Sequence, residues 1–474
     1  MKFNLRWSVL LLAFPMAGGL VAQGALPEAV ETGNTLATEV PPGLEEKPPL
    51  SDYDLSKKKE GSYFTGLPLI NSDADKGVGY GVRLYWYDNG EKSNPFFRYT
   101  PYKHRVYLQY FATTNGFQYH TLDWEAPYIG NSLWRIRTSL SYDLNTESNF
   151  FGGAVNGAGN NKLSELAALT GISDLSDKYL DITTDLRDNA GGTATETYSK
   201  YFRYKYTKPT ARFTGIYDMF GGVVRPVIGF QVQHVKIETY KNKSVKVTKT
   251  GEAEADYTQK DTLVDQMSAA GLITGVGEGL NNTILVGIAY DTRDFEPDPN
   301  NGIFAEALFE QSVASEHSWN RITVSPKFFY SPFNFDLVLA ARGAVSVMGG
   351  TVPFYELDQI GYTSGNSISN GGLRSLRGFA ESRFAGKAKA LGNFEIRWTM
   401  GDVDFIGQNF KFMLVPFVDF GSANNDIGKL SSNELRYTYG AGFRIPWNQA
   451  TIIMVDYGVS EEGGGMYINF NHIF

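Results

Sequence analysis

From about residue 61 to Phe474 the chain alternates apolar and polar residues, in segments of roughly eleven residues separated by turn sequences. In residues 134–145, the apolar row starting at Trp134 and Ile136 alternates with polar residues that include Arg135 and Arg137. A period of two predicts a β-strand whose faces meet different surroundings. The polar face is too charged for a protein core, so we predict membrane-spanning strands with lipid outside and water inside.

The alternation predicts an all-β fold, a sixteen-stranded antiparallel transmembrane β-barrel over residues 61–474. The strands are expected near residues 61–71, 77–88, 103–113, 117–127, 133–145, 198–218, 222–240, 283–293, 302–314, 319–331, 335–348, 388–400, 410–421, 433–446, 450–460 and 464–474. In this count the long connections 146–197, 241–282 and 349–387 all fall on the outer side, as barrels of this kind require. One inner turn, residues 89–102, is longer than expected.

The first residues predict export from the cytoplasm. Lys2 and Arg6 precede an apolar run over residues 7–17 and a stretch of small residues, so residues 1–25 are predicted to be a signal peptide. The run is too short for a transmembrane helix. Residues 26–60 contain two Pro-Pro pairs and little periodicity, which indicates a flexible periplasmic linker. The expected location is the cell outer membrane.

Composition agrees with a barrel and gives no sign of other chemistry. Aromatic residues make up 14% of the chain, as interfacial girdles require, whereas a secreted β-sandwich needs no charged interior row. The net charge of -8 gives no hint of nucleic-acid binding, and the absence of cysteine rules out thiolate metal sites. The five histidines are scattered, and Asp123 and Glu125 are best explained as lumen lining. We expect no enzyme activity, no cofactor and no metal.

One outer connection carries the candidate site. Residues 349–387 are rich in glycine and contain Arg377-Gly378-Phe379, and the following strands direct Glu395 and Asp419 into the lumen. An arginine suits a pair with these carboxylates because its planar guanidinium binds bidentately and keeps its charge. We therefore expect this extracellular loop to fold inward and its arginine to reach both acids. The simpler alternative is that Arg377 only pins a plug in the lumen.

At these residues the chain resembles the BamA/TamA family, also called the bacterial surface antigen barrel. The inward loop of that family carries an Arg-Gly-Phe or Arg-Gly-Tyr tip, which matches Arg377, Gly378 and Phe379, and its acidic partners match Glu395 and Asp419. Residues 292–302, with their Thr-Arg-Asp run followed by Pro and Gly, resemble a further element of the family. The resemblance implies a lock between loop and lumen that holds the barrel in a competent state.

The first and last strands of the barrel suggest a lateral seam where they meet. Gly66 and Pro68 in the first strand weaken its ladder, because a proline donates no hydrogen bond. We expect incomplete pairing with the last strand, where Phe470 and Phe474 stand on one parity, and a seam between residues 61–71 and 464–474 that opens sideways. A harmless bulge is the alternative. The final aromatic residue also resembles the signal that delivers barrels to the outer-membrane assembly machinery.

The resemblance implies insertion, assembly or translocation of outer-membrane components, with membrane lipids and unfolded barrel proteins as partners. Members that handle proteins carry periplasmic POTRA domains, and residues 26–60 are too short for one, so a separate periplasmic receptor is an option. A passive channel is the main alternative, favoured by lumen charges at Arg83, Arg105, Arg135, Arg137, Glu306, Glu310 and Arg342. A surface antigen or adhesin that uses its outer loops is a third.

Overall fold

The computed structural model describes residues 35–45, 47, 49–50, 55, 58–73, 76–152, 195–296, 298–333, 336–361, 368–405, 408–430, 435–447 and 451–474. The predicted signal peptide, residues 1–25, lies outside these ranges. Across the described ranges, no helix is long and apolar enough to cross a membrane.

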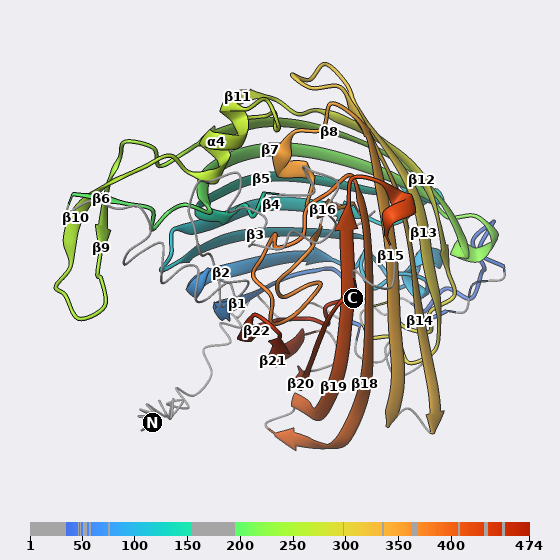
Figure 1. Ribbon diagram of the computed structural model, residues 1–474. Coiled ribbons are helices and arrows are strands. Elements are labelled where there is room, and N and C mark those ends of the chain that lie inside the picture. The colour runs from blue at the N-terminus through green and yellow to red at the C-terminus, as the bar shows by residue number, and fades with distance from the viewer. Residues whose placement is uncertain are drawn as a thin grey trace.

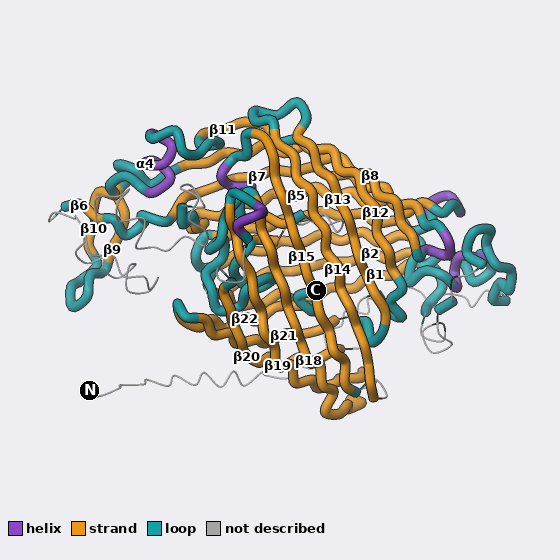
Figure 2. The backbone as a smooth tube through the Cα atoms, turned by 45° about the vertical axis from the view of Figure 1, so that its right-hand side comes forward, coloured by secondary structure: helices purple, strands orange, loops and turns teal. Residues whose placement is uncertain are grey.

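The chain forms a closed antiparallel β-barrel (Figures 1 and 2). Its strands are β1 (Ser62–Asp73), β2 (Gly77–Asp88), β3 (His104–Thr113), β4 (Phe117–Ala126), β5 (Trp134–Asn149), β7 (Arg203–Tyr217), β8 (Val224–Glu238), β11 (Gly277–Leu280), β12 (Thr283–Asp291), β13 (Gly302–Ser312), β14 (Trp319–Phe333), β15 (Leu337–Gly350), β18 (Ala388–Phe405), β19 (Gln408–Asn424), β20 (Arg436–Trp447), β21 (Thr451–Ser460) and β22 (Gly463–Phe470). Because β11 and β12 both pair with β8 and make one span, these segments form the sixteen predicted strands.

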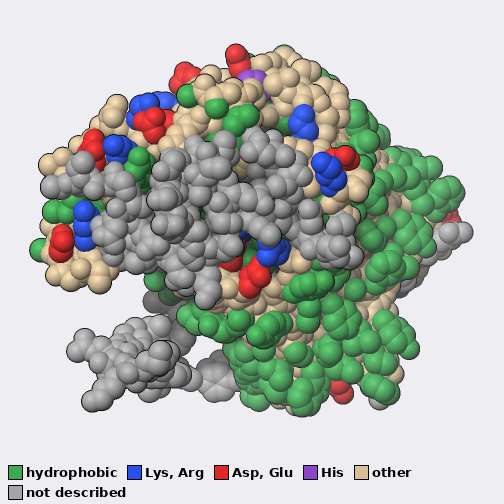
Figure 3. Space-filling view, in the orientation of Figure 1, with side chains coloured by type: hydrophobic (Ala, Val, Ile, Leu, Met, Phe, Trp, Pro, Cys, Tyr) green, Lys and Arg blue, Asp and Glu red, His purple; other side chains and the backbone are tan. Residues whose placement is uncertain are grey.

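The two faces of each strand meet different surroundings, as predicted. In β5, Trp134 and Leu140 are exposed on the outer surface, whereas Arg135 is buried on the lumen side. In β19, Val418 is exposed and Asp419 is buried. Figure 3 shows hydrophobic side chains covering the part of the surface over β14, β15, β18 and β19. This apolar surface is what a strand needs to face lipid, and the barrel fold supports an outer-membrane location.

Long connections gather at one end of the barrel, here called the outer end. A three-stranded sheet of β6 (Glu196–Thr197), β10 (Ala255–Gln259) and β9 (Ser244–Val247) projects there, beside α4 (Leu263–Ala269) (Figure 1). A buried cluster that includes Phe151, Tyr201, Leu263 and Phe354 joins this extension to the loop after β15. That loop contains η5 (Phe354–Glu356), β16 (Gln359–Ile360) and β17 (Ile368–Ser369). Another short helix at this end is η6 (Ile427–Lys429).

The opposite, inner end carries shorter turns, including η1 (Pro95–Arg98), η2 (Ile129–Asn131) and η4 (Phe220–Gly222). The described part of the expected linker packs on these turns. Leu44 is buried against Tyr99 and Tyr128, and Lys58 Nζ donates to the main-chain carbonyl of Phe97 over 2.6 Å. The Lys58 ammonium also lies 3.7 Å from the centre of the Phe97 ring. In these residues the segment is therefore an ordered arm, which the Pro-Pro pairs did not predict.

The seam between the first and last strands is sparsely paired. Every residue of β1 from Ser62 to Asp73 pairs with β2. Between β1 and β22, Ser72 with Ile468 is the one register pair within the described chain. β1 and β22 therefore lie side by side with a single register pair between them, whereas the other neighbouring strands pair along most of their lengths.

The expectation that the last strand runs to Phe474 is wrong over its final four residues. β22 ends at Phe470, and Asn471 adopts a left-handed conformation with φ 69°. Residues 471–474, called the tail below, then enter the lumen, where His472 and Ile473 are buried. Asn tolerates this conformation better than most residues, which makes it a suitable point for the chain to leave the sheet.

Candidate functional site

Packing and glycine conformation together position the loop that carries Arg377. Leu376 and Phe379 are buried in a cluster with Phe384, inside the barrel. Gly378 has φ 104°, and a Cβ placed on it would lie 3.0 Å from the main chain of Gly458 on β21. A side chain at either glycine would push the loop from the wall, so both are needed for the close approach.

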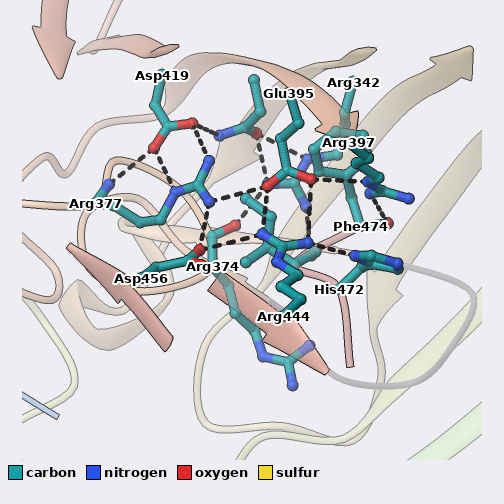
Figure 4. Close-up of polar contacts among 12 residues, drawn as sticks. Arg342, Arg374, Arg377, Glu395, Arg397, Asp419, Arg444, Asp456, His472 and Phe474 are labelled. Carbon is teal, nitrogen blue, oxygen red and sulfur yellow. Dashed lines mark hydrogen bonds and ion pairs between the residues drawn. The ribbon is translucent and has the colours of Figure 1, made fainter. Parts of the chain in front are cut away.

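The loop brings Arg377 to three carboxylates (Figure 4). Its Nε and Nη2 donate to the Asp419 oxygens over 2.9 and 2.8 Å, in the bidentate geometry that suits a guanidinium. Nη1 donates to Glu395 over 2.9 Å and to Asp456 over 2.6 Å. The guanidinium carbon lies 3.3 Å from the centre of the Phe417 ring. Arg377 therefore joins strands β18, β19 and β21 through one side chain.

The cluster balances its charges without solvent. Arg444 donates to Glu395 over 2.7 Å and to Asp456 over 3.2 Å, and Arg397 donates to Glu395 over 3.0 Å. All six side chains in these ion pairs are fully buried. Burial alone would lower the pKa of Arg377, but the Asp419, Glu395 and Asp456 carboxylates outweigh it and raise that pKa. The guanidinium is therefore charged at any physiological pH.

The tail is bound to the same cluster. Arg342 donates to the carbonyl of Ile473 over 3.3 Å and to the loop carbonyl of Arg374 over 2.5 Å. Arg397 donates to the Phe474 carbonyl over 3.1 Å. The Phe474 ring lies beneath both guanidinium groups, at 5.0 Å from Arg342 and 5.2 Å from Arg397. One set of arginines thus holds the inward loop and the end of the last strand together.

His472 is a further contact between the tail and the buried cluster. Its ring lies against the Arg444 guanidinium and 2.9 Å from the Asp298 carboxylate on the turn between β12 and β13. Burial, reinforced by the positive charge of Arg397, lowers the pKa of His472 to about 4. The imidazole is therefore neutral at neutral pH.

The turn between β12 and β13, which contains the predicted Thr-Arg-Asp element, belongs to a second ion network at the inner end. Arg293 pairs with Asp291 at 2.7 Å, and Arg225 reaches Asp291 at 2.8 Å, Glu296 at 3.0 Å and Asp218 at 3.3 Å. Pro297 lies outside the described residues.

The structure brings together Arg377, Glu395 and Asp419, with Gly378 and Phe379 at the loop tip. Sequence reasoning did not single out Asp456 or Arg444, although both occupy lumen positions by strand parity. Of the expected seam residues, Gly66 and Pro68 pair with Leu84 and Val82 on β2, and Phe470 pairs with Ile453 on β21. Phe474 lies in the lumen, and its place in the seam is a wrong prediction.

Two family models match the chain. Residues 118–471 match the Omp85 superfamily domain. Residues 40–103 match a domain of unknown function, DUF5982, and this range includes most of the described arm together with β1 and β2. The search of curated proteins found no match.

Several solved outer-membrane structures are similar to this chain. BamA from Haemophilus ducreyi lacking POTRA domains 1–3 matches with a TM-score of 0.50 and 11% identity, over 87% of this chain and 70% of that one. CdiB from Escherichia coli matches with a TM-score of 0.48 and 11% identity, over 85% of this chain and 62% of that one. CdiB from Acinetobacter baumannii has a TM-score of 0.43 and 10% identity, over 87% of this chain and 60% of that one. With its BamA-like sixteen-stranded barrel and the match over residues 118–471, the chain belongs to the Omp85 superfamily.

Proposed function

We propose that this barrel acts in the insertion or translocation of outer-membrane components, as expected of the BamA/TamA type. The observation that carries the proposal is that one buried ion cluster joins the inward loop to the tail of the seam strand. A passive pore does not require such a connection, because a loop that only narrows the pore needs only to be attached to the barrel wall.

In this proposal, Arg377, Gly378 and Phe379 with Glu395 and Asp419 form the lock. A fully buried ion cluster adds little net stability, because desolvation opposes the attraction between charges. Removing one member is different, because it leaves an uncompensated buried charge, which costs roughly 3–5 kcal/mol. The cluster is therefore expected to populate two states, one with all its ion pairs formed and one in which the loop has left the acids.

The seam between β1 and β22 is proposed as the lateral gate. Pro68 lies in β1 and has no amide hydrogen, so it would not donate to a facing strand. With one register pair joining the strands, opening costs few hydrogen bonds. A sheet edge freed in this way is a template for another strand, which is the property that barrel insertion needs. The partners expected on this basis are lipids and unfolded outer-membrane proteins, delivered directly or by a separate periplasmic receptor.

A folding assay in liposomes tests the proposal. Purified protein is reconstituted, and the folding rate of an unfolded outer-membrane barrel is followed beside empty vesicles. We expect wild type to accelerate folding, Arg377→Ala to lose the acceleration, and Arg436→Ala to retain it, because Arg436 pairs with exposed Glu461 outside the cluster. If wild type gave the rate of empty vesicles, an assembly role for the barrel alone would be ruled out.

A further inference from the structure

A row of tyrosines lines the lumen side of the first three strands. The Tyr63 and Tyr87 ring centres lie 5.2 Å apart, Tyr85 and Tyr87 lie 5.5 Å apart, and Tyr85 and Tyr107 also lie 5.5 Å apart. Tyr102, from the inner turn, extends the row at 5.6 Å from Tyr87. All five side chains are half-buried, so ring surface remains accessible from the lumen. The row leads from the inner mouth toward the middle of the barrel.

Two arginines lie on this row. Arg105 is 5.2 Å from the Tyr102 ring centre and pairs with Glu125. Arg83 is 5.3 Å from the Tyr107 ring centre, and its Nε donates to Gln109 over 2.8 Å. The partners of Arg83 are neutral, and within the described chain no carboxylate forms an ion pair with it. Its positive charge is therefore available to a ligand.

A second available cation comes from the inward loop. The Arg374 side chain is exposed and points away from the buried cluster, as Figure 4 shows. No carboxylate in the described ranges pairs with it. Although its side chain keeps accessible surface, Arg374 lies deep enough for desolvation to lower its pKa, and the positive charges of Arg342 and Arg83 lower it further. The carboxylate on neighbouring β4, Asp123, accepts a hydrogen bond from Thr121 over 2.9 Å.

The combination of tyrosine rings and arginines without carboxylate partners limits the class of ligand that the lumen wall can bind. Aromatic faces favour contact with flat apolar surfaces such as the C–H faces of sugar rings, whereas guanidinium groups favour phosphate or carboxylate. A bound polypeptide needs a free strand edge or side-chain pockets. The central strand of this wall has no free edge, because β2 pairs with β1 along its length and with β3 from Gly79 to Asp88, and the sparsely paired edge of β1 lies at the seam rather than on the tyrosine face.

We propose that the tyrosine row, with Arg83 and Arg374, binds an oligosaccharide that carries phosphate or carboxylate groups. The rings contact the sugars, and the two arginines hold the anions. This inference goes beyond the proposed assembly function and does not depend on it, because it requires neither seam opening nor a protein client.

Titration calorimetry on the full chain in detergent tests the site. The probes are glucosamine disaccharide bisphosphate and trigalacturonate, with the unphosphorylated disaccharide, maltotriose and inorganic phosphate as controls. We expect at least one anionic saccharide to bind about tenfold or more tightly than its neutral counterpart and than phosphate alone. Adding acylated lipid A as a further probe distinguishes a lipid-linked source, for which acylation strengthens binding, from a free saccharide, for which it does not.

Variants separate the two kinds of contact. Arg83→Gln and Arg374→Gln should each weaken binding about tenfold, whereas Arg436→Gln should leave it unchanged. Tyr85→Leu should weaken binding, and Tyr85→Phe, which keeps the ring, should weaken it less. Heat-modifiable migration on gels confirms that each variant is folded. The proposal is overturned if neither anionic saccharide binds more tightly than its neutral counterpart, if folded Arg83→Gln/Arg374→Gln binds like wild type, or if an acidic peptide of similar charge binds more tightly.

Discussion

Arg377 is the residue on which the buried cluster depends most. It donates to Asp419, Glu395 and Asp456, and no water-exposed surface remains on any of the four side chains to compensate for a lost partner. Sequence parity predicted two of these acids but not the third. Parity assigns a side chain to the lumen, whereas the depth of the loop decides which lumen residues it meets, and that depth follows from packing of Leu376 and Phe379.

Removal of the Arg377 charge should destabilise the barrel strongly. Arg377→Ala leaves Asp419 and part of Glu395 uncompensated, so we expect a loss of roughly 3–5 kcal/mol in the free energy of unfolding. The measurement is urea unfolding in detergent micelles. Arg436→Ala is the control, with an expected loss below about 1 kcal/mol because its ion pair with Glu461 is partly exposed. Equal losses in the two variants would show that the cluster has no special role.

His472 should make the fastening of the tail sensitive to acid. Its folded-state pKa of about 4 lies below the usual value of about 6.5, so the unfolded state binds more protons between these values. Stability should therefore fall as pH decreases from about 6.5 to about 4, by at most about 1.4 kcal/mol per pH unit from this group. His472→Gln should reduce the pH dependence of the unfolding midpoint between pH 7 and pH 5. An unchanged dependence would assign it to other groups.

At the scale of elements, period-two alternation predicted all sixteen strands, because the contrast between lipid and lumen repeats along each of them. The four-residue error at the last strand has a different origin. His472 and Phe474 continue the strand pattern in sequence, but inside the barrel Arg444 contacts His472, and Arg342 and Arg397 contact Phe474. Such long-range partners leave no periodic signal. The contacts of Leu44 with Tyr99 and Tyr128 are of the same long-range kind, and the apolar residues of the arm have no period that predicts them.

Contact between the inward loop and β21 should depend on Gly458. A Cβ at this position would lie 2.6 Å from the main chain of Arg377, so Gly458→Ala must displace the loop. We expect a loss of about 1–3 kcal/mol in the free energy of unfolding, as for other overpacked sites. Gly401→Ala in β18 is a matched control, because nothing lies within 4 Å of a Cβ there. A smaller effect at Gly458 than at Gly401 would contradict the close approach.

Docking of the arm should depend on Leu44. Because this side chain is buried between Tyr99 and Tyr128, Leu44→Ala should loosen the arm and accelerate its cleavage by an added protease, with the barrel left intact. Leu36→Ala, at an exposed position of the same segment, should leave the cleavage rate unchanged. Cleavage that is equally fast in wild type and Leu44→Ala would mean that the packed arm does not protect the chain.

For the whole molecule, the buried cluster and the seam belong to one mechanical unit. Arg377 fastens the loop to β18, β19 and β21. Arg397, which pairs with Glu395 in the same cluster, holds the tail that continues β22. In the proposed function, disruption of the lock also releases the end of the seam strand. This coupling distinguishes a barrel that opens sideways from a channel of fixed shape.

A disulfide across the seam shows whether β1 and β22 must separate for activity. Ser72 and Ile468 are register partners, and the separation of paired strands suits a disulfide, so Ser72→Cys/Ile468→Cys should lock β1 to β22 under oxidising conditions. The control, Val82→Cys/Tyr110→Cys, joins β2 to β3 inside the continuous ladder. In the liposome folding assay, we predict that oxidation abolishes activity of the seam variant, that reduction restores it, and that the control is active in both states. Full activity of the oxidised seam variant would contradict the lateral gate.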